Sequence, residues 1–149
     1  MAPIGTGATA PPIPGVDLRD GPRALWFYKV TCPVCQMAAP VAERLHQAFP
    51  RTVVGVGQDP LPRLEAFGSE FGASFHTVPD LPPYAVSEDF GIEVVPTLVV
   101  VADGKVADIV ESWDRDGYNR AFRVLASLTG REAAAVSEES DGLPVFRPG

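Results

Sequence analysis

The most constraining feature of the sequence is a pair of cysteines at the point where an apolar run gives way to an amphipathic one. The run Leu25–Tyr28 is entirely apolar or aromatic, and Cys32-Pro33-Val34-Cys35 follows it closely. Beyond the second cysteine, large apolar residues recur every four positions, at Met37, Val41, Leu45 and Phe49. The first pattern is typical of a buried strand and the second of a helix. The sequence therefore predicts a strand, a short turn and a helix, with two thiols at the helix start.

The position of the two thiols predicts different roles for them. A helix N-terminus carries partial positive charge and free N–H groups, which stabilise a thiolate. Cys32 lies where the turn meets the helix and is expected to be exposed, whereas Cys35 lies one turn further in and is expected to be more buried. This asymmetry suits an attacking and a resolving thiol, and C-x-x-C beside a strand–helix unit is typical of redox sites. The alternative is a pair of ordinary core cysteines.

Composition and charge exclude several classes of protein. The 149 residues suit one domain, and 46% hydrophobic with 21% charged residues is typical of a globular chain. The net charge of −7 argues against a nucleic-acid partner, and no apolar run is long enough to span a membrane. Residues 1–15 lack the features of a signal peptide. The chain has only two cysteines, too few for a disulfide framework, which suits a reducing compartment. Together these features predict a cytoplasmic protein.

The order of expected elements predicts an α/β fold. Strands are expected at 23–29, 51–57, 75–78, 94–101 and 105–111, and helices at 33–49, 61–72, 84–90 and 114–128. Helical crossovers join the early strands, while Asp103-Gly104 is a hairpin turn that makes the last two strands antiparallel. We therefore expect a mixed central β-sheet flanked by helices on both faces.

The two ends of the chain are expected to lie outside this domain. Residues 1–15 are rich in proline and glycine and are predicted to form an extended N-terminal segment, loosely ordered at its start. Residues 16–130 form the predicted domain, with a short edge strand at 16–18. Residues 131–149 are predicted to be a C-terminal extension, consisting of a short helical piece and a loose tail.

Three stretches resemble the thioredoxin-like superfamily, within its TlpA/ResA-type and peroxiredoxin-like branch. They are Trp26–Cys35, Val53–Asp59, and Asp89–Leu98 with the following Asp103-Gly104-Lys105-Val106. Together they span roughly residues 17–128. The combination of the cysteine box, a Val-Pro-Thr sequence some sixty residues later and a glycine turn is the specific part of this resemblance.

The resemblance implies a thioredoxin-like fold and a thiol–disulfide oxidoreductase activity without a cofactor. In such a protein Cys32 attacks a disulfide and Cys35 resolves the mixed disulfide. Pro33 and Val34 would tune the redox box, and the absence of histidine between the cysteines favours a reductant or a moderate exchanger. Protein or small-molecule disulfides are the implied substrates. The implied electron donor is a reducing partner such as a thioredoxin reductase or a low-molecular-weight thiol.

The resemblance also implies a substrate-binding surface. Pro96 is expected to be a cis proline packed against the dithiol, and the backbone of Val95 would pair with an extended substrate. Without the resemblance, Pro96 would be a proline tolerated at the first residue of a strand.

The sequence departs from the thioredoxin pattern in two places. Thr31 precedes the first cysteine where thioredoxins usually carry tryptophan, and Trp26 replaces their buried aspartate, so the usual proton acceptor is missing. Asp80 and Glu88 are candidate substitutes, although either one would otherwise be a solvated surface acid. Lys29 could favour the thiolate electrostatically, or it could be an exposed lysine without a role.

Other functions remain open at this stage. A peroxiredoxin-like peroxidase would use Cys35 as its peroxidatic thiol, but Tyr28 stands where that motif expects proline. A redox-inert binding module would dock a partner through the surface around Pro96. Two cysteines with His46 and His76 could in principle bind zinc, but their spacing fits no standard site, and no metal site is predicted.

Overall fold

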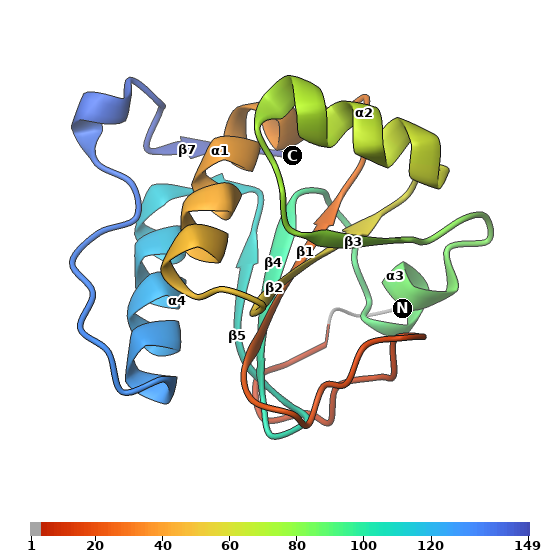
Figure 1. The fold of residues 1–149 in the computed structure, drawn as a ribbon, viewed down its shortest axis with the longest axis horizontal. Coiled ribbons are helices and arrows are strands. Elements are labelled where there is room, and N and C mark those ends of the chain that lie inside the picture. The colour runs from red at the N-terminus through yellow and green to blue at the C-terminus, as the bar shows by residue number, and fades with distance from the viewer. Residues whose placement is uncertain (1–3) are drawn as a thin grey trace.

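A five-stranded mixed sheet forms the centre of the computed structural model, which describes residues 4–149 (Figure 1). Its strands are β1 (Arg23–Tyr28), β2 (Val53–Gly57), β3 (His76–Pro79), β4 (Thr97–Ala102) and β5 (Lys105–Glu111), in the order β3-β2-β1-β4-β5. The pairs β1/β2 and β2/β3 are parallel, whereas β1/β4 and β4/β5 are antiparallel. β1, which leads into the cysteine box, is therefore the central strand.

Helices cover both faces of the sheet, but unequally. The helices are α1 (Pro33–Ala48), α2 (Leu61–Phe71), α3 (Ala85–Asp89) and α4 (Arg115–Leu128). Residues of α1, α2 and α4 share one core cluster with the sheet. The cluster on the other face contains residues of α3 and of the chain that precedes β1, notably Ile13 and Leu18. The predicted fold, a mixed sheet flanked by helices on both faces, is confirmed.

The central strands are buried on both faces, as expected for strands between two layers. Six strand residues were expected to be hidden from solvent, and their exposed fractions are 5% or less: Leu25, Phe27, Val54, Val56, Leu98 and Val100. β4 begins at Thr97 rather than at the predicted position 94. Pro96 has no backbone N–H to donate to a neighbouring strand, which explains the later start.

The N-terminal segment lies along the sheet. The Gly7 N–H donates to the Val106 carbonyl at 2.8 Å, and Thr9 forms a bridge with Lys105 at the outer edge of β5. The predicted edge strand at 16–18 is wrong, since Val16 forms only an isolated bridge with Ile13 across a tight turn. Residues 1–3, the start of the segment that was predicted to be loosely ordered, lie outside the described residues.

The C-terminal extension differs most from expectation. Its only helical piece is the 3-10 turn η1 (Glu139–Asp141), and residues 131–135 are not helical. β7 (Phe146–Arg147) pairs antiparallel with β6 (Trp113–Asp114), so the predicted loose tail is also wrong. Side chains of the main domain hold the extension through its backbone carbonyls, which is a contact that local sequence patterns do not reveal.

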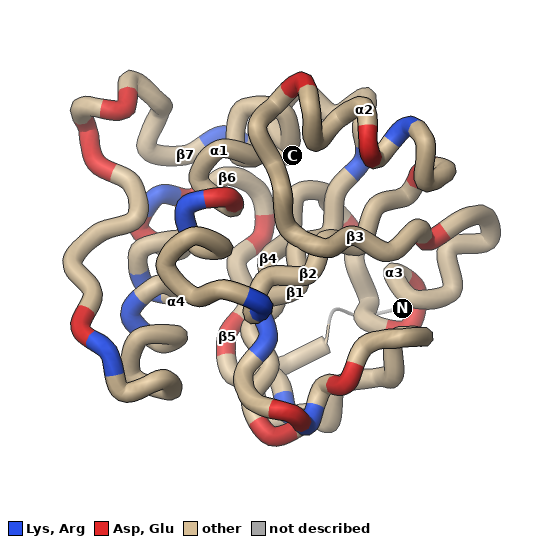
Figure 2. The backbone as a smooth tube through the Cα atoms, viewed as in Figure 1, with Lys and Arg blue, Asp and Glu red and all other residues tan. Residues whose placement is uncertain are grey.

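Charged residues of both signs are spread over the molecule (Figure 2). Two ion pairs connect separate elements: Arg44 with Asp141 at 2.7 Å, and Arg120 with Asp108 at 3.0 Å. In both pairs the arginine side chain is about half exposed, and ion pairs with an exposed partner contribute little to stability, about 0–1 kcal/mol. Within residues 4–149, none of the helices has the length and apolar character that a membrane crossing requires.

Candidate active site

Cys32 is the N-cap of α1. Its backbone is extended, with φ −84° and ψ 112°, and its sulfur accepts a hydrogen bond from the Cys35 N–H at 3.1 Å. Pro33 occupies the first helical turn, where its missing N–H would have no partner in any case. A sulfur therefore takes the place usually held by a serine or aspartate oxygen, and it faces the positive end of the helix.

The two thiols differ in exposure and in acidity. Cys32 is partly exposed, whereas Cys35 is completely buried. The Cys35 thiol donates a hydrogen bond to the Cys32 sulfur and, with the backbone N–H groups of α1 and the charge of Lys29, lowers the pKa of Cys32 to about 6 despite partial burial. Burial and that same hydrogen bond raise the pKa of Cys35. The geometry thus presents one thiolate at neutral pH above a thiol that keeps its proton.

The Val95–Pro96 bond lies beside the attacking thiol. This peptide bond is cis, as is Pro82–Pro83 in the loop before α3. The Cys32 Sγ is 3.5 Å from the Val95 carbonyl oxygen, to which the thiol form can donate. The Ser112 N–H donates to the Pro96 carbonyl at 2.8 Å, which ties this loop to the end of β5. The structure therefore places the predicted substrate-binding residues next to Cys32.

Neither candidate substitute for the missing aspartate serves the thiols in this structure. Trp26 is fully buried at that position and donates its Nε1–H to the Tyr118 hydroxyl at 2.9 Å. Asp80 is buried and accepts hydrogen bonds from the N–H and hydroxyl of Ser87, at 2.8 and 2.7 Å, so its carboxylate is used at the start of α3 rather than at the thiols. Glu88 is exposed on that helix.

Asp59 is the acidic residue beside the box, and the sequence reasoning missed it. Its carboxylate accepts the Val30 N–H at 2.9 Å and lies 3.7 Å from the Arg63 guanidinium. Burial raises the pKa of Tyr28 to about 12, and the nearby charge of Asp59 acts in the same direction. The sequence did contain a signal for Asp59, because this acid follows β2, which runs parallel to β1. The carboxyl ends of parallel strands meet at one edge of the sheet, which brings Asp59 close to the box.

The histidines lie in a different part of the fold from the box. His46 and His76 line a hollow together with Arg23 and Arg51, next to the N-terminal end of β1. Within residues 4–149, the structure brings together no group of three His, Cys, Asp or Glu side chains that could hold a metal ion.

Comparison with known proteins places this geometry in a family. No family model and no curated protein matches the chain. Among solved structures, DsbF of MTB, determined in mixed oxidized and reduced forms, is 30% identical, with a TM-score of 0.63 over 74% of this chain and 83% of that one. The chain belongs to the thioredoxin-like thiol–disulfide oxidoreductases.

Two further structures share the fold of this thioredoxin-like oxidoreductase. The thioredoxin domain of thiol-disulfide oxidoreductase BVU-2223 from Bacteroides vulgatus is 21% identical, with a TM-score of 0.69 over 82% of this chain and 99% of that one. A secreted Mycobacterium tuberculosis disulfide oxidoreductase homologous to E. coli DsbE is 22% identical, with a TM-score of 0.61 over 74% and 84%.

The peroxidase alternative is not favoured by this site. A peroxidatic cysteine must be an accessible thiolate, but Cys35 is completely buried and its pKa is raised. Tyr28, where that motif expects proline, is buried as well. The thiol that is equipped to react is Cys32.

We expect Cys32 to be alkylated before Cys35, with a pH midpoint of about 6 in the reduced oxidoreductase. Only the thiolate reacts, so the rate should be level above the midpoint and fall about tenfold for each pH unit below it. Mass spectrometry after limiting iodoacetamide, repeated from pH 4 to 9, measures both properties. Preferential labelling of Cys35, or a midpoint near that of a free thiol, would contradict this assignment.

Proposed function

We propose that this oxidoreductase reduces or exchanges protein disulfides through a mixed disulfide formed at Cys32. The observation that carries the proposal is a partly exposed, low-pKa Cys32 whose sulfur accepts the backbone N–H of the buried Cys35. The Cys32 thiolate attacks one substrate sulfur, the substrate S–S bond breaks, and the other substrate sulfur leaves as a thiolate that takes up a proton. The Cys35 sulfur then attacks Cys32 Sγ, which releases the second substrate thiol and leaves a Cys32–Cys35 disulfide.

The charge state of Cys32 couples the two steps. While Cys32 is a thiolate, its negative charge and the hydrogen bond between the two sulfurs add to burial in raising the pKa of Cys35. Once Cys32 is covalently bound in the mixed disulfide, that charge is gone, and Cys35 loses its proton more easily. Cys35 is therefore activated only when there is a mixed disulfide to resolve. Two electrons pass from the dithiol to the substrate in each cycle.

The substrate is proposed to bind as an extended chain along Val95 and Pro96. Val95 offers a backbone carbonyl next to Cys32 Sγ, and extended peptides bind such edges through main-chain hydrogen bonds. Pro33 and Val34 place no charge between the cysteines, which favours a reducing or moderate potential. A thioredoxin reductase or a low-molecular-weight thiol would return the dithiol to its reduced form.

The proposed function is tested by insulin reduction with a thiol donor, together with the reduction potential against glutathione. We expect Cys32→Ser to lower the rate by at least about a thousandfold, because the attacking sulfur is lost. Thr31→Ser is the matched control, since it changes an exposed neighbour and keeps both sulfurs. Retained insulin reduction in Cys32→Ser would overturn the proposal.

We also propose that the protein works in the cytoplasm, where a reducing thiol pool would keep its dithiol ready to donate electrons. The name of one structural neighbour calls that protein secreted. Acid quenching of cells followed by thiol alkylation should recover the protein mainly in the reduced form from the cytoplasmic fraction. Recovery of the oxidised form from an external fraction would contradict this location.

A further inference from the structure

The end of the described chain lies against the proposed substrate groove. The Gly149 N–H donates to the Ser112 hydroxyl at 3.1 Å, and the Ser112 N–H donates a hydrogen bond to the Pro96 carbonyl. A Cβ atom added to Gly149 would fall on the Val95 carbonyl oxygen and lie 2.8 Å from the Val95 carbonyl carbon. That same carbonyl oxygen is 3.5 Å from Cys32 Sγ. Gly149 therefore packs on the backbone group that the proposed function assigns to the substrate.

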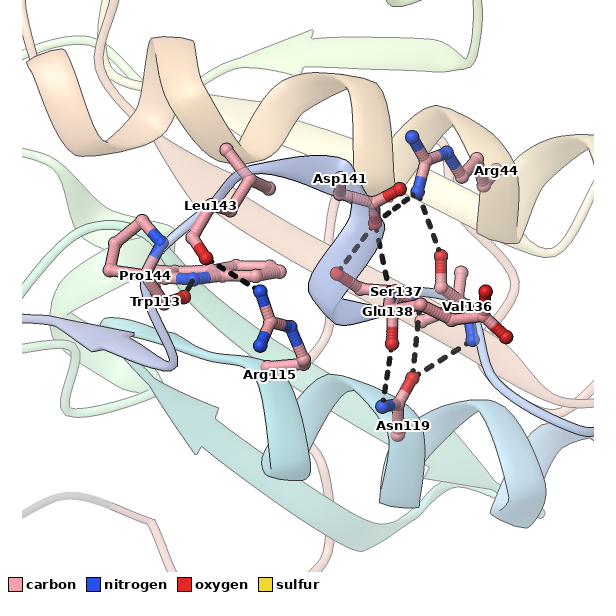
Figure 3. Close-up of polar contacts among 10 residues, drawn as sticks. All are labelled: Arg44, Trp113, Arg115, Asn119, Val136, Ser137, Glu138, Asp141, Leu143 and Pro144. Atoms are coloured by element: carbon pink, nitrogen blue, oxygen red, sulfur yellow. Dashed lines mark hydrogen bonds and ion pairs between the residues drawn. The ribbon is translucent and has the colours of Figure 1, made fainter.

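Side chains of the main domain hold the segment that leads to Gly149. Figure 3 shows Trp113 and Arg115 reaching the extension: Trp113 Nε1 donates to the Pro144 carbonyl and Arg115 Nη2 to the Leu143 carbonyl, both at 2.6 Å. Both donors are buried. Loss of either contact would leave a buried polar group unpaired, so the extension is fixed in position before it reaches the groove.

Between these anchors and Gly149, the chain runs beside the start of α1. β7 pairs with β6, so that Arg147 lies opposite Trp113. The Arg147 Nη1 atom is 3.9 Å from the sulfur of Met37, which follows the cysteine box on α1. Figure 1 shows β7 next to α1, with the end of the chain close by. The final residues thus lie between α1 and the loop that carries Val95 and Pro96.

We propose that residues 147–149 form a built-in cover over the Val95–Pro96 side of the substrate groove, which a polypeptide substrate must displace before its disulfide reaches Cys32. This inference rests on the proposed function, because it concerns the same groove. The cover lies against the Val95 carbonyl, where a substrate strand would pair, and is held there by the hydrogen bond from the Gly149 N–H to the Ser112 hydroxyl. It leaves Cys32 partly exposed, so a small reagent reaches the sulfur while an extended chain does not.

The expected consequence is selectivity by substrate size. While the cover is docked, the molecule cannot bind a polypeptide. The apparent affinity for a polypeptide is therefore the intrinsic affinity multiplied by the fraction of molecules in which the cover is displaced. The reaction of Cys32 with a small molecule needs no displacement and is unaffected. The cover therefore slows exchange with protein disulfides without changing the chemistry of the thiol.

Two variants and one matched control test the cover. Gly149→Ala places a methyl group on the Val95 carbonyl and should push the end of the chain away. A chain stopped after Arg147 lacks Pro148 and Gly149, the part of the cover that reaches the Val95 carbonyl, while keeping the anchors. Gly5→Ala is the control, because a Cβ at Gly5 meets nothing within 4 Å. The rates to be measured are insulin reduction and alkylation of Cys32 by a bulky polyethylene-glycol maleimide and by iodoacetamide.

Both cover variants are expected to react at least about fivefold faster with insulin and with the bulky maleimide. Their iodoacetamide rates should stay within about twofold of the parent, as should every rate of Gly5→Ala. Unchanged or slower bulky labelling in both cover variants would overturn the cover. Absence of insulin reduction in the parent would instead count against the proposed function, and the maleimide rates would still decide on the cover.

Discussion

The Cys35→Ser variant is expected to form a mixed disulfide with its substrate and to stop there. The attacking sulfur of Cys32 remains, but the sulfur that would release the substrate is gone. Cys35 is fully buried beside Cys32, and in the variant only a thiol added from solution could release the substrate. Without such a thiol, turnover should fall by at least about a thousandfold, while the first exchange step still proceeds.

Non-reducing electrophoresis and mass spectrometry after mixing with a disulfide substrate would measure this result. A covalent adduct at Cys32 should accumulate to near one per chain and disappear on addition of dithiothreitol. The reciprocal variant, Cys32→Ser, is the matched control and should form no adduct, because its remaining thiol is buried and its pKa is raised. Full turnover by Cys35→Ser would show that Cys35 does not resolve the mixed disulfide.

Replacing Trp26 with alanine is expected to lower the free energy of unfolding by about 3–5 kcal/mol. The Trp26 ring is completely buried in the centre of β1. It stacks on Tyr28 at a ring-centroid distance of 4.7 Å and meets the edge of Phe75 at 5.8 Å. Its Nε1–H donates to the buried Tyr118 hydroxyl. Truncation would leave a cavity below the cysteine box and an unpartnered hydroxyl.

Urea unfolding followed by circular dichroism would measure the change, and Trp26→Phe separates its two causes. Phenylalanine keeps most of the ring packing but loses the hydrogen bond, so it should cost about 1–3 kcal/mol. Trp26→Ala should cost clearly more than Trp26→Phe. A loss below about 1 kcal/mol in Trp26→Ala would contradict the role of this ring as the main support of the box.

The part of the fold that follows from local patterns could be predicted. Continuous apolar runs identified the buried strands, four-residue spacing identified α1, and the Asp103-Gly104 turn identified the antiparallel hairpin. The path of the C-terminal extension could not be predicted in the same way. It depends on Trp113 and Arg115, which reach carbonyls about thirty positions away along the chain. A donor that pairs with a distant backbone carbonyl leaves no periodic signal.

The candidate site, like the fold, could be predicted only in part from the sequence. The different environments of Cys32 and Cys35 follow from a box at the start of a helix, which is a local property. The acid beside the box was sought in the loop at Asp80, but the structure places Asp59 there. Asp59 comes close because β2 runs parallel to β1, so its position depends on strand pairing. Sequence reasoning that follows one segment at a time does not weigh such neighbours.

The contact between the N-terminal segment and β5 bears on how the protein behaves at high concentration. β5 is an outer strand of the sheet, and an uncovered outer strand invites pairing with the same strand of another molecule. Gly7 and Ala10 donate hydrogen bonds to the Val106 and Gly104 carbonyls, and the Val106 N–H donates to Ala8. These backbone groups are therefore already paired within the chain. The N-terminal segment, which the sequence predicted to be loosely ordered, therefore shortens the length of β5 that is open to pairing with another molecule.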